Sequence, residues 1–454
     1  MYSKAKQRLT ALVGDHDHNI LKGGLTGIEK ESLRVGADGS IAQTPHPAVL
    51  GSALTHPSIT TDYSEALLEF ITPPLESAGA ALDYLRDLQH FVYMKLEGEL
   101  LWSSSMPCVV AGGESIPIAR YGSSNIGLMK TVYRRGLGYR YGRVMQVIAG
   151  VHYNYSFADA FWSARQQLEG DRRPQQDYMS EQYFALIRNL QRFGWLIPYL
   201  FGTSPAVCKS FLSGKTTTLQ EFSDNTYYSP YATSLRMCDI GYQNSLENEV
   251  GFKANYDSLP DYITSLTCAI ETPSPRFAEI GVKVDGIYRQ LNANMLQIEN
   301  EYYSSVRPKQ VPVDNEKPTL ALQRRGVRYV ELRSMDINVF DPCGISDQQC
   351  RFIETFMAFC QLQDSPRISS LERIEIDYNL DAVAYRGREP GLQLQRHGES
   401  ISLQQWAGEL CAAMQAFAEA LDRGEDGTPY REALRVQQEA VSDPGKTLSA
   451  QVLD

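Results

Sequence analysis

The sequence predicts an α+β fold, with strands and helices mixed along one globular chain. β-prone residues are concentrated in three segments, residues 27–35, 144–156 and 326–334, as is typical of strands. Elsewhere, apolar residues recur at three- and four-residue spacing over long segments, which indicates amphipathic helices. Hydrophobic residues make up 43% of the chain and charged residues 21%, without a charge block or a low-complexity run. We therefore expect the whole chain to be globular.

Length, charge and cysteine content narrow the class of protein. The 454 residues suffice for one large domain or for about two to four smaller ones. The net charge of −11 argues against a dedicated nucleic-acid-binding protein. The eight cysteines include no Cys-x-x-Cys pair, which argues against a zinc knuckle or a thioredoxin-type redox pair. We recognise no signal peptide, and the most hydrophobic stretch, residues 193–208, is too short and proline-rich to span a membrane. A reduced, cytoplasmic protein is expected.

The strand predicted over residues 27–35 carries two carboxylates on one face. Side chains two residues apart in a strand point the same way, so Glu29 and Glu31 should lie roughly 6–7 Å apart. At an effective dielectric constant of about 20, their repulsion is about 2–2.5 kcal/mol. Cations placed between the two carboxylates would keep such a semi-buried pair ionised. The alternative is an edge strand whose glutamates face solvent.

Residues 60–72 fit either a helix or a strand. A helix would place Glu65 and Glu69 four residues apart, where like charges repel. We favour a strand that ends before Pro73. Glu69 is then a lone carboxylate between apolar neighbours, which requires a partner.

A helix is predicted over residues 75–101 and a loop over residues 121–137. The loop segment is dense in glycine, tyrosine and arginine, a composition that suits a cradle for an anion or another ligand. A mobile surface loop is the alternative. The earlier motif Asp15-His16-Asp17-His18 lies in a polar, turn-like segment, and we do not expect it to bind a metal.

The strand predicted over residues 144–156 has a polar face. Every second residue shares that face, which gives the set Gln146, Ile148, Gly150, His152 and Asn154. A lone histidine in a strand is usually a hydrogen-bonded core residue. Here the neighbouring amides and the space left by the glycine favour a role for His152 in a ligand or metal site.

The middle of the chain is expected to contain helices and loops. Helices are predicted over residues 181–201, 260–270 and 274–281. A second tyrosine-rich loop, residues 229–242, contains Arg236 and Tyr242. The remaining segments are residues 289–303, which look strand-like and then irregular, and residues 307–318, predicted to be a surface connection.

The last predicted strand, residues 326–334, projects Glu331 and Arg333 from one face. A cross-strand ion pair is the simpler explanation of this arrangement. Three helices with ordinary apolar spacing are predicted after it, over residues 347–363, 403–421 and 430–441.

These strands supply a set of side chains suited to metal binding. The set consists of Glu29, Glu31, Asp62, Glu69, His152 and Glu331. Oxygen-rich sites with one histidine suit Mg²⁺ or Mn²⁺ better than zinc. Several such cations imply a polyphosphate substrate, and Arg134, Arg236 and Arg333 are suited to clamp its oxygens or a carboxylate. We find no Ser-His-Asp or Cys-His nucleophile signature, so the residues alone predict a metal-dependent phosphoryl-transfer enzyme with an anionic co-substrate.

Seven segments closely resemble the bacterial glutamate–cysteine ligase family. They are GIEKESLRV, GSALTHPSITTDYSEALLEFITP, GVHYNYSF, RFGWLIPYLFG, PYATSLR, LQIENEYY and YVELRSMDIN, and the resemblance runs from about residue 21 to residue 364, more weakly beyond. It implies a glutamine-synthetase-like fold, in which a curved, mainly antiparallel sheet forms a funnel-shaped active site with helices outside. It also implies ATP as co-substrate and Mg²⁺ or Mn²⁺ as cofactor. The implied reaction, the first step of glutathione biosynthesis, joins glutamate to the amine of cysteine through γ-glutamyl phosphate.

The resemblance also implies roles for individual residues. The metal-binding positions are Glu29, Glu31, Asp62, Glu69, His152 and Glu331. The catalytic positions that steady the transferred phosphoryl group are Arg333 and Arg134. The substrate-binding positions are Arg236, Gln146 and the backbone near Ile148 for glutamate, and Tyr63, Tyr133, Leu137, Tyr242 and Tyr303 around the acceptor amino acid. Asn154 is a further expected substrate-binding residue.

Two departures from the family pattern leave alternatives open. Tyr63 stands where the family usually has phenylalanine, so the acceptor is cysteine or another small amino acid or amine. Residues 1–370 are expected to form the catalytic domain, and residues 371–454 a mainly helical C-terminal part of the same domain that is shorter than in relatives. In some relatives the counterpart of Cys108 pairs with a cysteine near residues 162–168, a segment that has none here, so no such disulfide is expected.

Two other kinds of protein could carry the same set of carboxylates and arginines. A metal-dependent phosphohydrolase would turn over nucleotide without glutamate, and a non-catalytic nucleotide-binding or scaffold protein would lose its carboxylates without effect. We expect instead a monomer that acts on glutamate, cysteine and ATP, without nucleic-acid or membrane partners.

Overall fold

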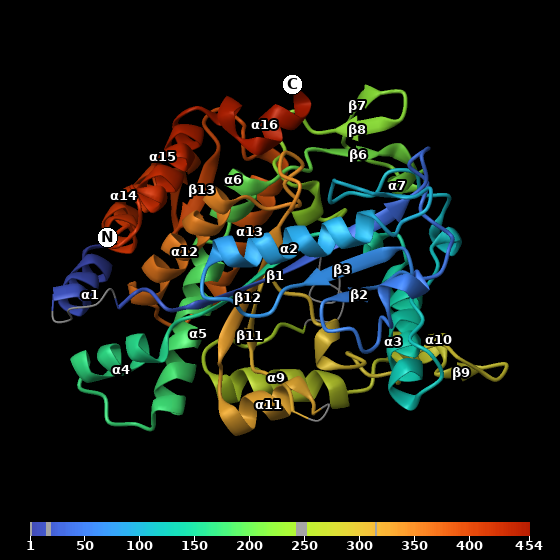
Figure 1. The fold of residues 1–454 in the computed structure, drawn as a ribbon, viewed down its shortest axis with the longest axis horizontal. Coiled ribbons are helices and arrows are strands. Elements are labelled where there is room, and N and C mark those ends of the chain that lie inside the picture. Colours follow the sequence, from blue (N-terminus) through green and yellow to red (C-terminus); the bar gives the residue numbers. More distant parts are fainter. Residues whose placement is uncertain (1, 15–19, 242–251, 314–315) are drawn as a thin grey trace.

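The protein is built around a seven-stranded sheet that is covered by helices (Figure 1). The computed structural model describes residues 2–14, 20–241, 252–313 and 316–454. The strand order is β11-β12-β5-β1-β3-β2, all neighbours are antiparallel, and β4 pairs with the end of β1. The strands are β1 Leu25–Val35, β2 Ile59–Thr61, β3 Leu67–Ile71, β4 Leu100–Leu101, β5 Val151–Ser156, β11 Val306–Lys309 and β12 Tyr329–Met335. The predicted α+β class is confirmed.

Strand β1 lies in the middle of the sheet and sets the register of its neighbours. Its pairing with β5 places Glu29 opposite His152, and its pairing with β3 places Glu31 opposite Glu69. β12 follows on the other edge of β5 and contributes Glu331. Because alternate side chains of a strand share a face, these four carboxylates and the imidazole start from neighbouring positions on one side of the sheet.

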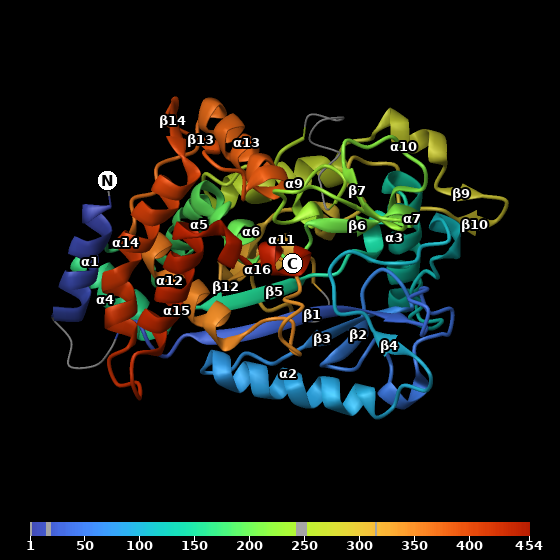
Figure 2. The ribbon, with the colours of Figure 1, turned by 90° about the horizontal axis from the view of Figure 1, so that it is seen from above.

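The two faces of β1 have different surroundings. Lys30 lies on the face opposite the carboxylates, and its Nζ donates a hydrogen bond of 2.6 Å to Gln89 in α2 (Ala78–Tyr93). Thr26, on the same face as Lys30, donates to Glu354 of α12 (Asp347–Leu362). Figure 2 shows α2 along one side of β1 and β3, with α3 (Asn125–Tyr141) and α9 (Leu259–Glu271) on the other side. The carboxylate face is therefore enclosed by α3 and by the segments near α9.

The remaining elements complete the cover of the sheet. The helices are α1 Ser3–Gly14, α4 Asp159–Leu168, α5 Gln175–Phe193, α6 Leu196–Phe201, α7 Lys209–Leu212, α10 Pro275–Ile280, α11 Pro318–Arg325, α13 Ser370–Arg386, α14 Leu403–Leu421, α15 Pro429–Ser442 and α16 Leu448–Leu453. The small sheets consist of β6 Ala206–Cys208, β7 Gln220–Ser223 and β8 Thr226–Tyr228, of β9 Lys283–Val284 and β10 Ile287–Tyr288, and of β13 Gln393–Arg396 and β14 Glu399–Ser402.

Most of the predicted elements are present, with ends shifted by a few residues. The first strand is β1, the ambiguous segment 60–72 forms strands rather than a helix, and the last strand is β12. The predicted helices correspond to α5 with α6, α9, α10, α12, α14 and α15. The helix predicted over residues 75–101 is shorter, because α2 ends at Tyr93 and residues 100–101 form β4. The division of the chain at residue 370 stays a prediction.

The loop predicted over residues 121–137 is wrong, because most of this segment is helix α3. Ser124 caps the helix by accepting a hydrogen bond of 3.1 Å from the backbone N–H of Gly127. The glycines allow close packing rather than flexibility. A Cβ on Gly136 would lie 2.2 Å from Gln297 Oε1, and one on Gly138 would lie 2.5 Å from the Tyr63 hydroxyl.

Three other predictions also need correction. The strand predicted over residues 144–156 begins only at Val151, because Met145–Val147 form a 3₁₀ turn and the N–H of Ala149 donates to Ser105 rather than to a neighbouring strand. The surface connection predicted over residues 307–318 begins with β11 at the edge of the sheet, where a proline is tolerated. Residues 289–303 contain a 3₁₀ turn at Glu299–Glu301 rather than a strand.

Candidate active site

The carboxylate face of the sheet forms the floor of a cavity of about 520 Å³. Strands β1, β5 and β12 contribute to the floor, α3 forms one wall, and residues 298–303 form another. The cavity is lined by the following residues of the set predicted from sequence: Glu29, Glu31, Asp62, Tyr63, Glu69, Tyr133, Arg134, Leu137, Gln146, His152, Tyr303, Glu331 and Arg333. Segments that are far apart in the chain therefore meet in one place.

Three residues of the predicted set lie just outside the cavity, and one cannot be placed. Ile148 and Arg236 are buried behind its wall, with 0% and 1% of their surface exposed. Asn154 donates a hydrogen bond of 3.0 Å to Glu29 and so contacts the site through that carboxylate. Tyr242 lies outside the described residues, as does the motif at residues 15–18.

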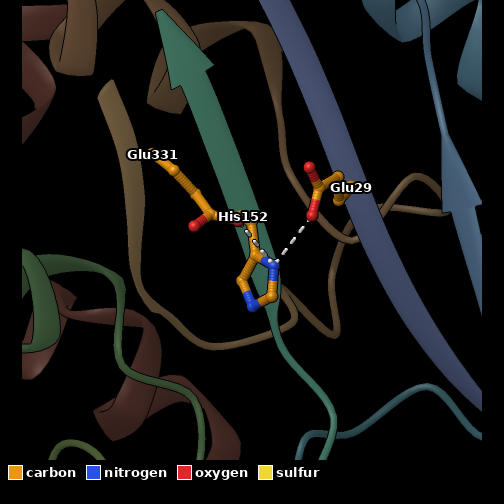
Figure 3. Close-up of side chains that lie close together, drawn as sticks. All are labelled: Glu29, His152 and Glu331. Atoms are coloured by element: carbon orange, nitrogen blue, oxygen red, sulfur yellow. Dashed lines mark hydrogen bonds and ion pairs between the residues drawn. The ribbon is translucent and has the colours of Figure 1, made fainter. Parts of the chain in front are cut away.

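Glu29, His152 and Glu331 form a compact group of potential metal ligands at the floor of the cavity. One ligand atom from each side chain lies within 4.8 Å of the others. His152 Nδ1 is 3.1 Å from Glu29 Oε2 and 3.7 Å from Glu331 Oε1. Figure 3 shows the three side chains directed toward one another from β1, β5 and β12. Two carboxylates and one imidazole form a donor set that suits Mg²⁺ or Mn²⁺.

The charges around this group keep its members in the states that bind cations. Burial alone would raise the pKa of Glu331, but the charges of Lys309 and Arg333 hold it well below the usual value. Burial and the Arg333 guanidinium lower the pKa of His152. Glu331 is therefore a carboxylate at neutral pH and His152 a neutral imidazole, the forms in which both side chains coordinate metals.

Two other carboxyl groups of the cavity, those of Glu31 and Glu69, have too little positive charge near them to be fully ionised at neutral pH. Burial and the Asp62 carboxylate raise the pKa of Glu31 to about 8. Burial raises the pKa of Glu69 well above its usual value, and the charges of Glu29, Asp62 and Glu31 add to this effect. Protein groups alone therefore do not neutralise the negative charge of the cavity, and added cations would return both groups to the carboxylate form.

A buried oxygen at the floor also fits a cation. Glu331 Oε2 is shielded from solvent and has no hydrogen-bond partner among the described residues. A buried carboxylate oxygen without a partner is costly, because the oxygen has lost its water. The unpartnered oxygen, the raised pKa values of Glu31 and Glu69 and the neutral His152 all indicate that these residues fit one or more divalent cations.

Two guanidinium groups lie beside carboxylates of the cavity. Arg333 NH1 donates a hydrogen bond of 3.0 Å to Glu331, and its guanidinium lies 5.8 Å from the ring of Tyr303. Arg134, on α3, donates to the carbonyl of Asp62 and packs 4.6 Å from the ring of Tyr121. Both side chains are mostly buried, at 13% exposure each, which strengthens their interaction with an anion in the cavity.

A third guanidinium, that of Arg236, is held tightly behind the cavity wall. Its NH2 donates a hydrogen bond of 2.9 Å to the carbonyl of Arg333, and its NH1 lies 3.9 Å from the buried Asp336 carboxylate. The guanidinium packs on Gly150, where a Cβ would lie 2.2 Å from NH2. Gly150 also donates its N–H to Glu31 Oε2 at 2.7 Å. Gly150 therefore contacts both the guanidinium and the Glu31 carboxylate.

Of the cationic residues of the cavity that the sequence interpretation missed, two lie on β11, Arg307 and Lys309. Lys309 Nζ lies 3.4 Å from Glu331 Oε1, and the charges of Glu331 and Glu29 raise its pKa although burial opposes this. Both residues lie on one face of β11, which was predicted as part of a surface connection. The alternation Arg307-Pro308-Lys309 was the signal for a strand, but the proline argued against it.

Replacing Tyr63 by phenylalanine is expected to raise the free energy of unfolding by about 1 kcal/mol. The Tyr63 side chain is buried, and its hydroxyl has no hydrogen-bond partner among the described residues. Removal of an unpartnered buried hydroxyl relieves its desolvation cost. Urea-induced unfolding of both proteins measures the difference.

Tyr183→Phe is the matched control for this prediction. The Tyr183 hydroxyl is equally buried, but it donates a hydrogen bond of 2.9 Å to the Arg328 carbonyl and accepts one from Phe157. This substitution should therefore lower the free energy of unfolding by about 1 kcal/mol. Equal destabilisation by the two substitutions would show that the Tyr63 hydroxyl does have a partner.

Comparisons with known proteins agree with this geometry. The family profile for glutamate–cysteine ligase matches residues 9–383. A protein of Alcanivorax borkumensis named glutamate–cysteine ligase is 52% identical over 99% of this chain and 86% of its own length. One of the same name from Pseudomonas entomophila is 50% identical over 98% of this chain and 84% of its own length.

A solved structure extends the similarity to three dimensions. The glutamate–cysteine ligase of Francisella tularensis, crystallised in complex with AMP, superposes with a TM-score of 0.88 at 38% identity, over 95% of this chain and 84% of that chain. The glutamine-synthetase-like architecture implied by the sequence resemblance is confirmed. Within the part of the chain that the structure describes, no helix has the length and apolar character needed to cross a membrane. By sequence and by structure, the chain belongs to the glutamate–cysteine ligase family.

Proposed function

We propose that the protein joins the γ-carboxylate of glutamate to the amine of cysteine at the expense of ATP, the reaction that begins glutathione biosynthesis. Membership of an ATP-dependent ligase family supports this proposal. The observation that carries it is the convergence of carboxylates, a neutral imidazole and guanidinium groups in one cavity. Such a cavity suits the transfer of a phosphoryl group between two anionic substrates.

Glu29, His152 and Glu331 are proposed to hold one divalent cation, with Glu31, Asp62 and Glu69 as the ligands of further cations. The oxygen-rich donor set favours Mg²⁺, with Mn²⁺ as the alternative. The chemistry supplied by such cations, when bound, is the neutralisation of phosphate charge. The polar contacts of Asn154 with Glu29, and of Gly150 with Glu31, keep these carboxylates in place.

The reaction proceeds in two steps. The γ-carboxylate of glutamate attacks the terminal phosphorus of ATP, which gives γ-glutamyl phosphate and ADP, and the amine of cysteine then displaces phosphate. Arg333 and Arg134 stabilise the charge on the transferring phosphoryl group, because both lie in a mostly buried part of the cavity. Arg236, with Gln146 and the backbone near Ile148, is proposed to bind the carboxylate of glutamate.

Tyr63, Tyr133, Leu137 and Tyr303 are proposed to form the pocket of the acceptor amino acid, with Tyr242 as a further member from outside the described residues. The Tyr63 hydroxyl touches Gly138 of α3 and has no polar partner within the described part of the chain. That hydroxyl supports a second candidate, a γ-glutamyl ligase that prefers another small amino acid or amine. Action as a cytoplasmic monomer stays a prediction.

An assay of ADP release tests the proposal and ranks the acceptors. With glutamate, ATP and Mg²⁺, turnover should require an amine, and cysteine should give a higher kcat/KM than 2-aminobutyrate or bulkier analogues. A higher kcat/KM for another amine would favour the second candidate. ADP release without glutamate would indicate a phosphohydrolase and would refute both ligase functions.

Mg²⁺ is expected to stabilise the protein more at pH 8.5 than at pH 6. The raised pKa of Glu31, about 8, means that the ion-free fold binds this proton more tightly than the unfolded chain does. Its contribution to stability is therefore present at low pH and is lost as the pH rises through about 8. Between the usual pKa of 4.5 and a pH of about 8, each rise of one pH unit removes about 1.4 kcal/mol of stability. Bound Mg²⁺ should suppress this loss, because it favours the carboxylate in the fold.

Thermal unfolding with EDTA or with Mg²⁺ measures the effect. Between pH 6 and pH 8.5, the gain in Tm from Mg²⁺ should grow by about 3 °C or more. Glu31→Gln removes the titrating group, so the Tm of the ion-free variant should depend less on pH. A gain that is equal at both pH values would show that the cations bind away from Glu31.

A further inference from the structure

Glu301, a buried carboxylate beside the last turn of α3, holds the cavity-lining side chain of Tyr141 in one orientation. The Tyr141 hydroxyl donates a hydrogen bond of 2.7 Å to Glu301 Oε1. Arg140 NH1 donates one of 2.8 Å to the same oxygen, and the N–H of Gln297 donates one of 2.7 Å to Oε2. The side chains of Arg140 and Glu301 are both 0% exposed. Both oxygens of this carboxylate are therefore occupied by donors of the protein.

Arg140, the cationic partner of that carboxylate, is itself fixed on several sides. Its Nε donates a hydrogen bond of 2.9 Å to Gln290 Oε1, and its NH2 donates one of 2.8 Å to the carbonyl of Asn292. The guanidinium also packs 4.1 Å from the centre of the Phe277 ring. The carboxylate that accepts the Tyr141 proton is therefore held by a rigid neighbour and has little freedom to turn away.

The hydrogen bond to Glu301 determines how the Tyr141 hydroxyl can act on a ligand. Burial raises the pKa of Tyr141, and the Glu301 charge raises it further, so the phenol keeps its proton at neutral pH. That proton is directed to Glu301, so toward a ligand the hydroxyl oxygen can only accept a hydrogen bond. Tyr141 lines the cavity, so the oxygen belongs to the surface that a substrate meets.

Tyr141 lies in an uncharged corner of the cavity, at the C-terminal end of α3. Leu137 and Tyr141 are four residues apart in the helix, so they share a face, and both line the cavity. Tyr63 reaches the same end of the helix, because its hydroxyl lies against Gly138. Met145, in the 3₁₀ turn after α3, also lines the cavity. A small and weakly polar group fits these neighbours better than a carboxylate or an ammonium group does.

We propose that Tyr141 is a specificity-determining residue of the acceptor site, where its oxygen accepts a hydrogen bond from the thiol of cysteine. This inference rests on the proposed ligase function. A thiol combines an apolar sulfur with a weak S–H donor, which suits an uncharged corner with one fixed acceptor. 2-Aminobutyrate has a methyl group in place of the thiol and cannot donate. A site that bonds a polar substrate group discriminates against the analogue that lacks it, because the polar group of the site is left unpaired.

The assay of ADP release with the two acceptors, on the full-length protein and on Tyr141→Phe, tests the proposal. In the variant, kcat/KM for cysteine should fall by about five- to tenfold, the loss expected for one hydrogen bond. The value for 2-aminobutyrate should fall by less than about twofold, because this acceptor makes no bond to the hydroxyl. The KM values for ATP and glutamate should also stay within about twofold.

Two controls separate loss of the thiol contact from a general defect. Tyr139→Phe removes the hydroxyl of an exposed tyrosine on the same helix that is not among the residues lining the cavity, so it should leave both kcat/KM values unchanged. The two acceptors are also compared on one preparation of each protein. A loss of packing around Glu301 would lower kcat/KM for both acceptors together, so the ratio of the two values reports the contact with the thiol alone.

The ratio of kcat/KM for cysteine to that for 2-aminobutyrate decides the proposal. An equal loss for both acceptors would show that Tyr141 only supports the structure, and an unchanged value for cysteine would show that the thiol does not contact its oxygen. Either result would overturn the inference and leave the ligase function standing. ADP release that does not require an amine in the unmodified protein would instead refute the ligase function, and the inference with it.

Discussion

Replacing Arg333 by alanine is expected to lower kcat by about a thousandfold or more while the fold stays intact. The guanidinium is mostly buried beside Glu331, so it acts on a phosphoryl group in a region of low dielectric constant. An arginine that stabilises the transition state of phosphoryl transfer increases kcat by a factor of about 10³–10⁵. The backbone contacts of Arg333, from its N–H to Ser305 and from Arg236 to its carbonyl, do not depend on its side chain.

Two further variants test whether the loss of kcat is specific to the Arg333 guanidinium. Arg333→Lys keeps the charge but loses the planar fork, so an intermediate loss of about 10- to 100-fold in kcat is expected. Arg328→Ala removes an arginine that precedes β12 and forms a more exposed ion pair with Asp159, outside the cavity. Its kcat should stay within about twofold of the unmodified protein.

ADP release and thermal unfolding, measured on all three variants, decide the role of Arg333. The Tm of Arg333→Ala should fall by no more than a few degrees. If its kcat stayed within about tenfold of the unmodified protein, Arg333 would not stabilise the transferring phosphoryl group. If instead the KM for ATP rose and kcat were unchanged, the guanidinium would bind ATP and the transition state equally well.

The strands and helices that could be predicted from sequence are those whose pattern is local. β1 and β12 are recognisable because β-prone residues flank a charged pair, and α12 and α14 because apolar residues follow the helical period. Helix α3 could not be recognised in this way. Its glycines look like loop residues, whereas two of them pack against side chains distant in sequence, Gly136 against Gln297 and Gly138 against Tyr63. A single sequence does not show such long-range contacts.

The same distinction applies to the candidate site. The two-residue period of a strand was enough to predict that Glu29 and Glu31 share one face of their strand, and that Glu331 and Arg333 share one face of theirs. It did not show that these strands are neighbours across β5, which follows from the sheet order. Lys309 was missed because its strand is recognisable only once β11 is paired with β12. The sequence thus identifies ligand types, and strand pairing determines which of them meet.

Gly150 is a position where one methyl group should disturb substrate binding. A Cβ there would lie 2.2 Å from Arg236 NH2 and 2.7 Å from Cζ, closer than non-bonded atoms approach. The Arg236 side chain is 1% exposed, so it has little free space to move into. Any displacement would also break the hydrogen bond from its NH2 to the carbonyl of Arg333. Gly150→Ala should therefore displace the group proposed to bind the carboxylate of glutamate.

The expected result is a rise of at least about tenfold in the KM for glutamate, since a charge-assisted hydrogen bond contributes about 1.5–3 kcal/mol. The KM for ATP should change less than about threefold, because the methyl group lies on the side of Arg236. Gly79→Ala is the control, since a Cβ there meets nothing within 4 Å and Gly79 lies in α2. It should leave both KM values unchanged and raise Tm slightly.

The KM values for glutamate and for ATP distinguish two questions: whether the methyl group displaces Arg236, and whether Arg236 binds glutamate. An unchanged KM for glutamate, with a crystal structure in which the guanidinium has moved, would show that Arg236 does not bind this substrate. A parallel rise of both KM values would indicate that the methyl group disturbs Glu31 as well, because Gly150 donates its N–H to that carboxylate. A selective rise for glutamate is the result that a carboxylate-binding guanidinium packed on Gly150 predicts.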